Sequence, residues 1–259
     1  MASPALSKSV SKHILGPFYS FLCLLKTVCL ILKCPRIGQV KTRLANAIGA
    51  EQATLIYRAL VEHQCTEIPS QWEVSICFTP ANAEDEMRDW LEPHLTSGAS
   101  FLPQVDGDLG QRLTMVVQTE FARERERVFL IGGDCPGLSR DYFLQADDAL
   151  DSNDVVIGPA QDGGYVLLGL KRPVAFATSK EPVLSSLKGP ALSLPKRLQA
   201  LFANIAWSSS AVLEQTLGAA RDQNLSVRQL HPLADIDDLA SLNAQFELIQ
   251  NILRKERSR

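Results

Sequence analysis

Several basic side chains directly follow an apolar run near the start of the chain. Residues 27–32 are the run, and the next segment, residues 33–44, reads KCPRIGQVKTRL. Lysine supplies a compact positive charge, arginine can grip a phosphate through two hydrogen bonds, and glycine lets backbone N–H groups approach a ligand closely. The segment lacks the Gly-Lys-Ser/Thr of a Walker A loop, so it predicts either a different polyphosphate-binding loop or a solvated basic turn. If the loop binds a polyphosphate, its positive charge comes from Lys33, Arg36, Lys41 and Arg43, and Gly38 allows the close approach of the backbone.

A carboxylate follows a second apolar run. Residues 131–138 read IGGDCPGL, in which two glycines separate Asp134 from the apolar residues 128–131. Mg²⁺ in phosphate chemistry typically takes one or two carboxylates together with substrate phosphate oxygens. The pattern therefore predicts Asp134 as a metal ligand, with a turn residue before a helix from Ser139 as the alternative.

A second acidic segment lies near the end of the chain. Residues 234–239 read ADIDDL. Three acidic residues before a helix commonly act as caps and as partners of the helix dipole. The other interpretation is that this segment supplies a second metal ligand.

Two further segments that contain glycine are candidates for contact with a nucleotide. In GPAQDGGY, residues 158–165, Gly163 and Gly164 either close a hairpin turn after Asp162 or form a floor for a flat nucleotide ring. In DGDLGQR, residues 106–112, Asp108 either contacts a nucleotide or caps the next helix.

Alternating strands and helices must position these residues. The predicted strands cover residues 27–32, 74–78, 100–102, 128–131, 154–157, 165–170 and 225–230. The predicted helices run from the basic loop to about 63, over 83–91, from 107–110 to about 125, from 208 or 209 to 221, and from 237 or 238 to about 253. This alternation is typical of an α/β fold with a mostly parallel sheet, where ligands bind at the carboxyl ends of the strands.

Composition narrows the function classes. The 259 residues carry a net charge of −3, which gives no support for nucleic-acid binding, and 46% of them are hydrophobic, as in a globular protein. Six cysteines without a CxxC pair favour a reduced, cytoplasmic protein. No GxSxG, HExxH or GxGxxG motif occurs, which disfavours a triad hydrolase, a zincin and a dinucleotide-dependent dehydrogenase.

Two segments fall outside this core pattern. Residues 1–25 include an apolar stretch that resembles a signal peptide, but Gly16-Pro17 interrupts it. We expect an N-terminal extension outside the core and no membrane-spanning helix, followed by one transferase domain over residues 26–259. Residues 178–199, rich in proline and polar residues, are expected to be a surface insertion or mobile loop.

Taken in order, the motifs resemble a bacterial family. KCPRIGQVKTRL, IGGDCPGL, GPAQDGGYVLLGL, the Trp207-Ser208-Ser209 helix start and ADIDDLASL are similar to motifs of DUF2064 proteins. These are also called "transferase 1, rSAM/selenodomain-associated" and are often labelled glycosyltransferases. The resemblance covers about residues 28–242. It extends to GT-A-fold enzymes, including molybdenum-cofactor guanylyltransferase and 2-phospho-lactate guanylyltransferase.

The resemblance implies a GT-A-like three-layer α/β/α fold and a transferase that depends on Mg²⁺ or Mn²⁺. The basic loop would hold the phosphates of an NTP or NDP-sugar, Asp134 would hold the metal, and Asp237 would add an acidic contact. Lys41 and Asp134 would then serve catalysis of transfer to a small acceptor. The motifs leave open glycosyl or nucleotidyl transfer, the base, the acceptor and the oligomeric state. A non-catalytic nucleotide-binding module and a membrane-associated protein remain the alternatives.

Overall fold

A single mixed sheet forms the centre of the computed structural model, which describes residues 26–95, 98–173 and 194–256. Its seven strands lie in the order β3-β2-β1-β4-β6-β5-β7. The strands are β1 Lys26–Lys33, β2 Glu73–Thr79, β3 Ala99–Pro103, β4 Arg127–Ile131, β5 Val155–Pro159, β6 Tyr165–Lys171 and β7 Val227–Gln229. Strand β6 is antiparallel to both neighbours, whereas all other pairs are parallel. The predicted mostly parallel α/β fold is confirmed.

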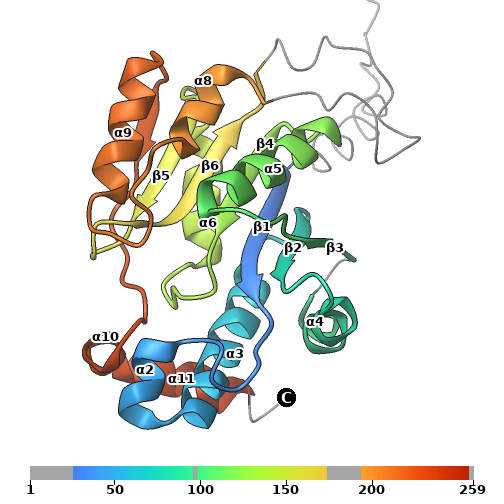
Figure 1. The fold of residues 1–259 in the computed structure, drawn as a ribbon, viewed down its shortest axis with the longest axis vertical. Coiled ribbons are helices and arrows are strands. Elements are labelled where there is room, and N and C mark those ends of the chain that lie inside the picture. The colour runs from blue at the N-terminus through green and yellow to red at the C-terminus, as the bar shows by residue number, and fades with distance from the viewer. Residues whose placement is uncertain (1–25, 96–97, 174–193, 257–259) are drawn as a thin grey trace, which may run out of the picture.

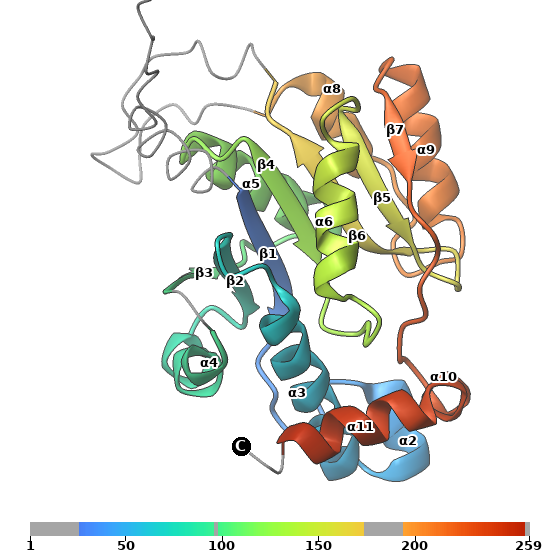
Figure 2. The same cartoon turned by 180° about the vertical axis from the view of Figure 1, so that it is seen from behind.

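Helices cover both faces of the sheet. The helices are α2 Thr42–Ile48, α3 Ala50–Glu67, α4 Glu84–Leu91, η1 Glu92–His94, α5 Leu109–Ala122, α6 Arg140–Ala149, α8 Lys196–Gln199, η2 Ala200–Phe202, α9 Val212–Asp222, α10 Leu239–Ala244 and α11 Phe246–Glu256. Figure 1 shows α5, α8 and α9 on one face, and Figure 2 shows α3 and α6 on the other.

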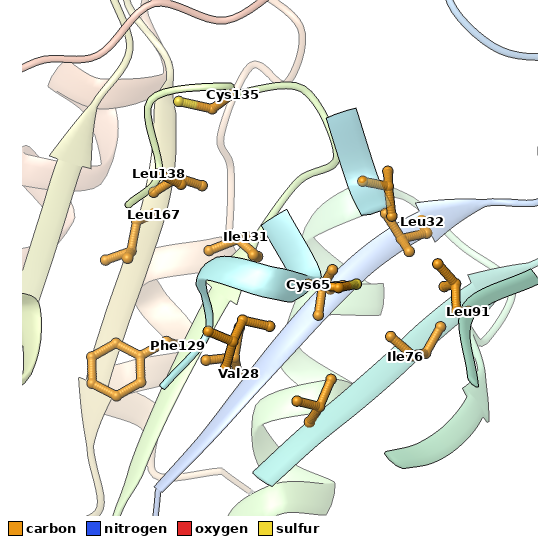
Figure 3. Packing of buried hydrophobic residues seen from close by; sticks show 14 of the residues in the cluster. Val28, Leu32, Cys65, Ile76, Leu91, Phe129, Ile131, Cys135, Leu138 and Leu167 are labelled. Carbon is orange, nitrogen blue, oxygen red and sulfur yellow. The ribbon is translucent and has the colours of Figure 1, made fainter. Parts of the chain in front are cut away.

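Alternating side chains of the same strands build two cores, because successive residues of a strand point to opposite faces. Leu30 and Phe129 pack with α3, α4 and α6 in one core, part of which Figure 3 shows. Cys29 and Leu130 pack with α5, α8 and α9 in the other. Because β1 and β4 are buried on both sides, residues 28–32 and 128–131 are apolar at every position.

A third cluster brings the end of the chain back to its beginning. Leu44 of α2 and Leu60 of α3 pack against Ile236, and against Ile249 and Ile252 of α11. Figure 2 shows α11 beside α2 and α3. This packing carries the acidic segment of residues 234–238 to the loop that follows β1.

Several helices begin or end at other residues than predicted. The first is divided at Gly49, whose φ of 92° ends α2 and begins α3. The last is divided at Gln245, between α10 and α11. Helix α9 begins at Val212, later than predicted, because the Ser209 hydroxyl accepts a hydrogen bond from Ala211 N at 3.3 Å within the preceding turn.

The predicted insertion at 178–199 is wrong at its end. Helix α8 lies there, and Leu194 and Leu198 are buried in the second core, so residues 194–199 belong to the packed domain. The rest of that segment and the N-terminal extension lie outside the described residues. Five cysteines in the described ranges are free and buried. Among the described helices, none combines the length and apolar character needed to cross a bilayer.

Candidate active site at the carboxyl ends of the strands

The loop after β1, which carries Lys41, meets the loop after β4, which carries Asp134, at the point where the strand order reverses. Strand β1 lies between β2 and β4, so the loop after β1 and the loop after β4 leave adjacent strand ends. Such a reversal opens a crevice at the carboxyl ends of the strands. Backbone hydrogen bonds fix both loops: Cys34 N donates to Thr79 O at 2.8 Å, and Ile236 N donates to Asp134 O at 2.9 Å.

Lys41 connects the basic loop to two predicted acidic residues. Its ammonium contacts Asp134 Oδ1 and Ile236 O, and lies 3.2 Å from Asp237 Oδ1. Its side chain is only 5% exposed, whereas those of Asp134 and Asp237 are each 43% exposed. The backbone of Lys41 is left-handed, with φ at 47°, a conformation that costs energy for a residue with a side chain. The structure therefore brings Lys41, Asp134 and Asp237 together.

Three aspartates beside this contact form a group suited to a cation. The carboxylate oxygens of Asp162, Asp235 and Asp237 lie within 4.8 Å of one another. Burial, together with the negative charges of Asp162, Asp237 and Asp134, raises the pKa of Asp235 to about 6. Carboxylate oxygens are the ligands that Mg²⁺ and Mn²⁺ prefer, so the donor set fits either ion.

Sequence reasoning did not select Asp162 and Asp235 as metal ligands. The signal for Asp235 was its Asp-x-Asp spacing with Asp237, and the signal for Asp162 was its position in the turn between two predicted strands. Asp134, which was selected, is paired with Lys41 and lies beside the group.

The acidic segment after β7 is held against β5 by backbone bonds. Leu230 N donates to Ile157 O at 2.9 Å, and Leu233 N donates to Pro159 O at 3.0 Å. The Tyr142 hydroxyl donates to His231 O at 2.9 Å. These contacts continue the sheet beyond β7 and deliver Asp235 and Asp237 to the strand ends.

The turn between β5 and β6 positions Asp162. The turn is the hairpin that the sequence offered as one alternative, with Asp162 Oδ1 accepting from Gly164 N at 2.9 Å. Gly163 has φ at 94°, and a Cβ there would lie 2.2 Å from Ser210 O. Leu213 N also donates to Gly163 O at 2.9 Å. The backbone before α9 therefore requires a glycine at 163, and the predicted nucleotide floor stays a prediction.

The other loop residues surround the Lys41 contact. Lys33 is exposed at the end of β1, and Gly38 has φ at 78° with open space where a Cβ would project. The Arg43 side chain is 71% exposed and its Nη1 lies 3.8 Å from Asp237 Oδ2. Arg36 instead pairs with Glu86 of α4 at 2.5 Å. Lys33, Gly38 and Arg43 are thus accessible to a ligand.

Asp108 has the structural role that the sequence gave as an alternative. Its side chain accepts from Gln111 N at 2.8 Å, and Gln111 Oε1 accepts from Asp108 N at 3.0 Å, which is a capping box at the start of α5. Contact with a nucleotide at Asp108 stays a prediction.

Comparison with known proteins finds a family model that matches part of the chain. Residues 63–185 match the family described as "Uncharacterized protein conserved in bacteria (DUF2064)". The phosphoenolpyruvate guanylyltransferase of Chloroflexus aurantiacus is 28% identical over 151 residues, which are 56% of this chain and 70% of that protein.

Solved structures resemble the chain over most of its length. A "putative nucleotide-diphospho-sugar transferase" from Desulfovibrio desulfuricans G20 has a TM-score of 0.68 at 25% identity, covering 88% of this chain and 98% of that one. A cytidylyltransferase from Leptospira borgpetersenii has a TM-score of 0.50 at 12% identity, covering 90% and 96%. The predicted DUF2064 resemblance is confirmed, as is a fold shared with nucleotide-diphospho-sugar transferases and nucleotidyltransferases.

Proposed function

We propose that this chain, with its DUF2064 match and transferase fold, is a divalent-metal-dependent transferase that uses a nucleotide substrate. The observation that carries the proposal is the contact of Lys41 with Asp134 and Asp237, beside Asp162 and Asp235. A phosphate-binding loop and a metal-binding group are complementary in charge. Their meeting at adjacent strand ends is the arrangement that a metal–nucleotide complex requires.

Within this class we favour nucleotidyl transfer from an NTP. The guanylyltransferase relative supports it, as does the accumulation of basic residues in the loop after β1. The acceptor oxygen would attack the α-phosphorus, form a new P–O bond and release pyrophosphate. The likeness to a nucleotide-diphospho-sugar transferase supports a second candidate, glycosyl transfer, in which attack at the sugar carbon releases the NDP.

The residues divide into cationic and acidic partners of the substrate. Lys33 and Arg43, together with backbone N–H groups near Gly38, would hold the nonbridging phosphate oxygens. Asp134 and Asp237 would hold Mg²⁺ or Mn²⁺ with Asp162 and Asp235. The ion, when bound, would offset phosphate charge and polarise the phosphorus. Lys41 would add positive charge beside the developing negative charge, and such preorganised electrostatics commonly dominates catalysis.

Product analysis tests the proposal and separates its two forms. The protein would be incubated with Mg²⁺, labelled NTPs or NDP-sugars, and small acceptors that include phosphoenolpyruvate, the substrate named for the relative. Pyrophosphate release identifies nucleotidyl transfer, and NDP release identifies glycosyl transfer. Nucleotide binding without either product would contradict catalysis and favour a non-catalytic binding module.

A pair of variants tests the role of Asp134. Asp134→Asn removes a charge from the candidate metal site, whereas Asp148→Asn removes one from an exposed position on α6. We expect turnover to fall by about 10²–10³-fold in the first, as on loss of one strong electrostatic contact, and to be unchanged in the second. Full activity of Asp134→Asn with Mg²⁺ would show that its assigned role is wrong.

A further inference from the structure

Protein oxygens occupy the Lys41 ammonium in this conformation, through two hydrogen bonds, to Ile236 O and Asp237 Oδ1, and an ion pair with Asp134. An ammonium has three donors and no acceptor. Three oxygens surround it, from Asp134, Ile236 and Asp237. With its side chain 5% exposed, the group lies beneath the surface of the site.

Asp237 takes part in two sets of contacts, the ion pair with Lys41 and the group of three aspartates. Its carboxylate contacts Lys41 and is also part of the group with Asp162 and Asp235 that could hold a metal. Two cations on one carboxylate repel each other strongly where water is partly excluded. The nearby guanidinium of Arg43 is 3.8 Å from Asp237 and largely solvated, so it compensates the carboxylates less than Lys41 does.

We propose that Lys41 is the resident cation of the aspartate group and that a divalent ion displaces it. The inference rests on the proposed function, because it assumes that the group binds a metal. When the ion binds Asp237, the Lys41 ammonium leaves that carboxylate and becomes available to the nucleotide phosphates. The flexible four-carbon chain of lysine permits this exchange while the backbone of the loop stays in place.

The exchange couples the binding of the metal ion to the binding of the nucleotide. A nucleotide phosphate that attracts Lys41 weakens the contact of Lys41 with the aspartates. The aspartates then bind the metal more strongly. By reciprocity, the metal strengthens nucleotide binding by the same factor. Lys41 would thereby disfavour the binding of either ligand alone and favour the metal–nucleotide complex.

Direct measurement of Mn²⁺ binding tests the inference without an activity assay. Free Mn²⁺ would be followed by electron paramagnetic resonance in the wild type, in Lys41→Met and in Arg36→Met. The last variant removes the same charge from the same loop, but its partner is Glu86. Without nucleotide, we expect Lys41→Met to bind Mn²⁺ about tenfold more tightly than the wild type, and Arg36→Met to change the affinity by less than about threefold.

A measurement on the wild type guards against misfolding of Lys41→Met. Acetylation of individual lysines would be followed by mass spectrometry, with exposed Lys171 as the reference. We expect Lys41 to react slowly without metal and several-fold faster with saturating Mn²⁺, while Lys171 does not change.

The outcomes separate this inference from the proposed function. Mn²⁺ binding with equal or weaker affinity in folded Lys41→Met, or unchanged protection of Lys41 at saturating Mn²⁺, would overturn the exchange and leave the metal site standing. Absence of Mn²⁺ binding in both the wild type and Lys41→Met would overturn the exchange and the metal-dependent function together.

Discussion

The Tyr57 hydroxyl is bonded to both backbone polar groups of Lys33: it accepts from Lys33 N at 3.1 Å and donates to Lys33 O at 3.0 Å. Its ring also lies against the loop after β4, because a Cβ on Gly133 would be 3.1 Å from Tyr57 Cε2. Burial raises the pKa of Tyr57 far above its usual value, so the hydroxyl keeps its proton. One side chain of α3 thus positions the start of the basic loop and the backbone before Asp134.

Tyr57→Phe should therefore weaken nucleotide binding as well as stability. Loss of both hydrogen bonds leaves the Lys33 backbone groups without these partners and costs about 1–3 kcal/mol in the free energy of unfolding. We expect a several-fold rise in the nucleotide dissociation constant, measured by calorimetry, and a lower urea midpoint. Ser75→Ala is the control, since it loses one buried bond between the sheet and α5, from Ser75 Oγ of β2 to Glu120 Oε1. Equal nucleotide affinity in both variants without metal would contradict the positioning role of Tyr57.

The elements of the site could be predicted because their signals are local. Residues 28–32 and 128–131 are continuously apolar, and β1 and β4 are buried on both faces. The ends of these strands then indicated where Lys41 and Asp134 would lie. The breaks at Gly49 and Gln245 were missed, because helical periodicity continues across both positions.

The composition of the acidic group could not be predicted from local pattern. Asp162 and Asp235 meet because β6 inserts antiparallel between β4 and β5, and because the chain after β7 runs along β5. Likewise, both side-chain hydrogen bonds of Lys41 go to Ile236 and Asp237, almost 200 positions away. Packing of α11 on α2 and α3 brings these segments together, along with the backbone bonds that hold the chain after β7 against β5 and the loop after β4.

Asp235→Asn should have opposite effects on the metal-free and metal-bound protein. Ionised Asp235 is destabilised by burial and by neighbouring carboxylates, so its neutral amide should raise the melting temperature of the metal-free protein. The same variant should lose most of the stabilisation by Mn²⁺, which for the wild type is about 2.7 kcal/mol at a hundred times the dissociation constant. Thermal unfolding with and without Mn²⁺ measures both effects. An undiminished Mn²⁺ shift would exclude Asp235 as a ligand, and Asp148→Asn should behave as wild type in both conditions.

The affinity for Mn²⁺ should depend on pH through Asp235. Its pKa is raised to about 6 in the folded protein from an ordinary value of 3.8. Without metal, a fall in pH from above 6 towards 4 therefore stabilises the fold through this residue, since the folded state takes up the proton first. Metal binding must displace that proton, so the affinity should fall by about tenfold per pH unit below 6. Titrations between pH 7.5 and 5 would show this slope, and Asp235→Asn should flatten it. A wild-type affinity that is constant across the range would refute the coupling.

Two glycine substitutions should separate backbone strain from steric conflict. Gly38→Ala and Gly163→Ala both place a side chain at positive φ, which costs about 1–2 kcal/mol. At Gly38 the new methyl meets nothing within 4 Å, so stability should fall by that amount only, while a phosphate held against the loop backbone should bind more weakly.

At Gly163 the methyl would lie 2.2 Å from Ser210 O, so the turn must move and take Asp162 with it. We expect Gly163→Ala to lose more stability than Gly38→Ala and to bind Mn²⁺ more weakly, because Asp162 leaves the aspartate group. Denaturant unfolding and Mn²⁺ titration of both variants measure the two effects. If Gly163→Ala retained wild-type Mn²⁺ affinity, Asp162 would not be a ligand, and the ion would be held by the carboxylates of the other loops.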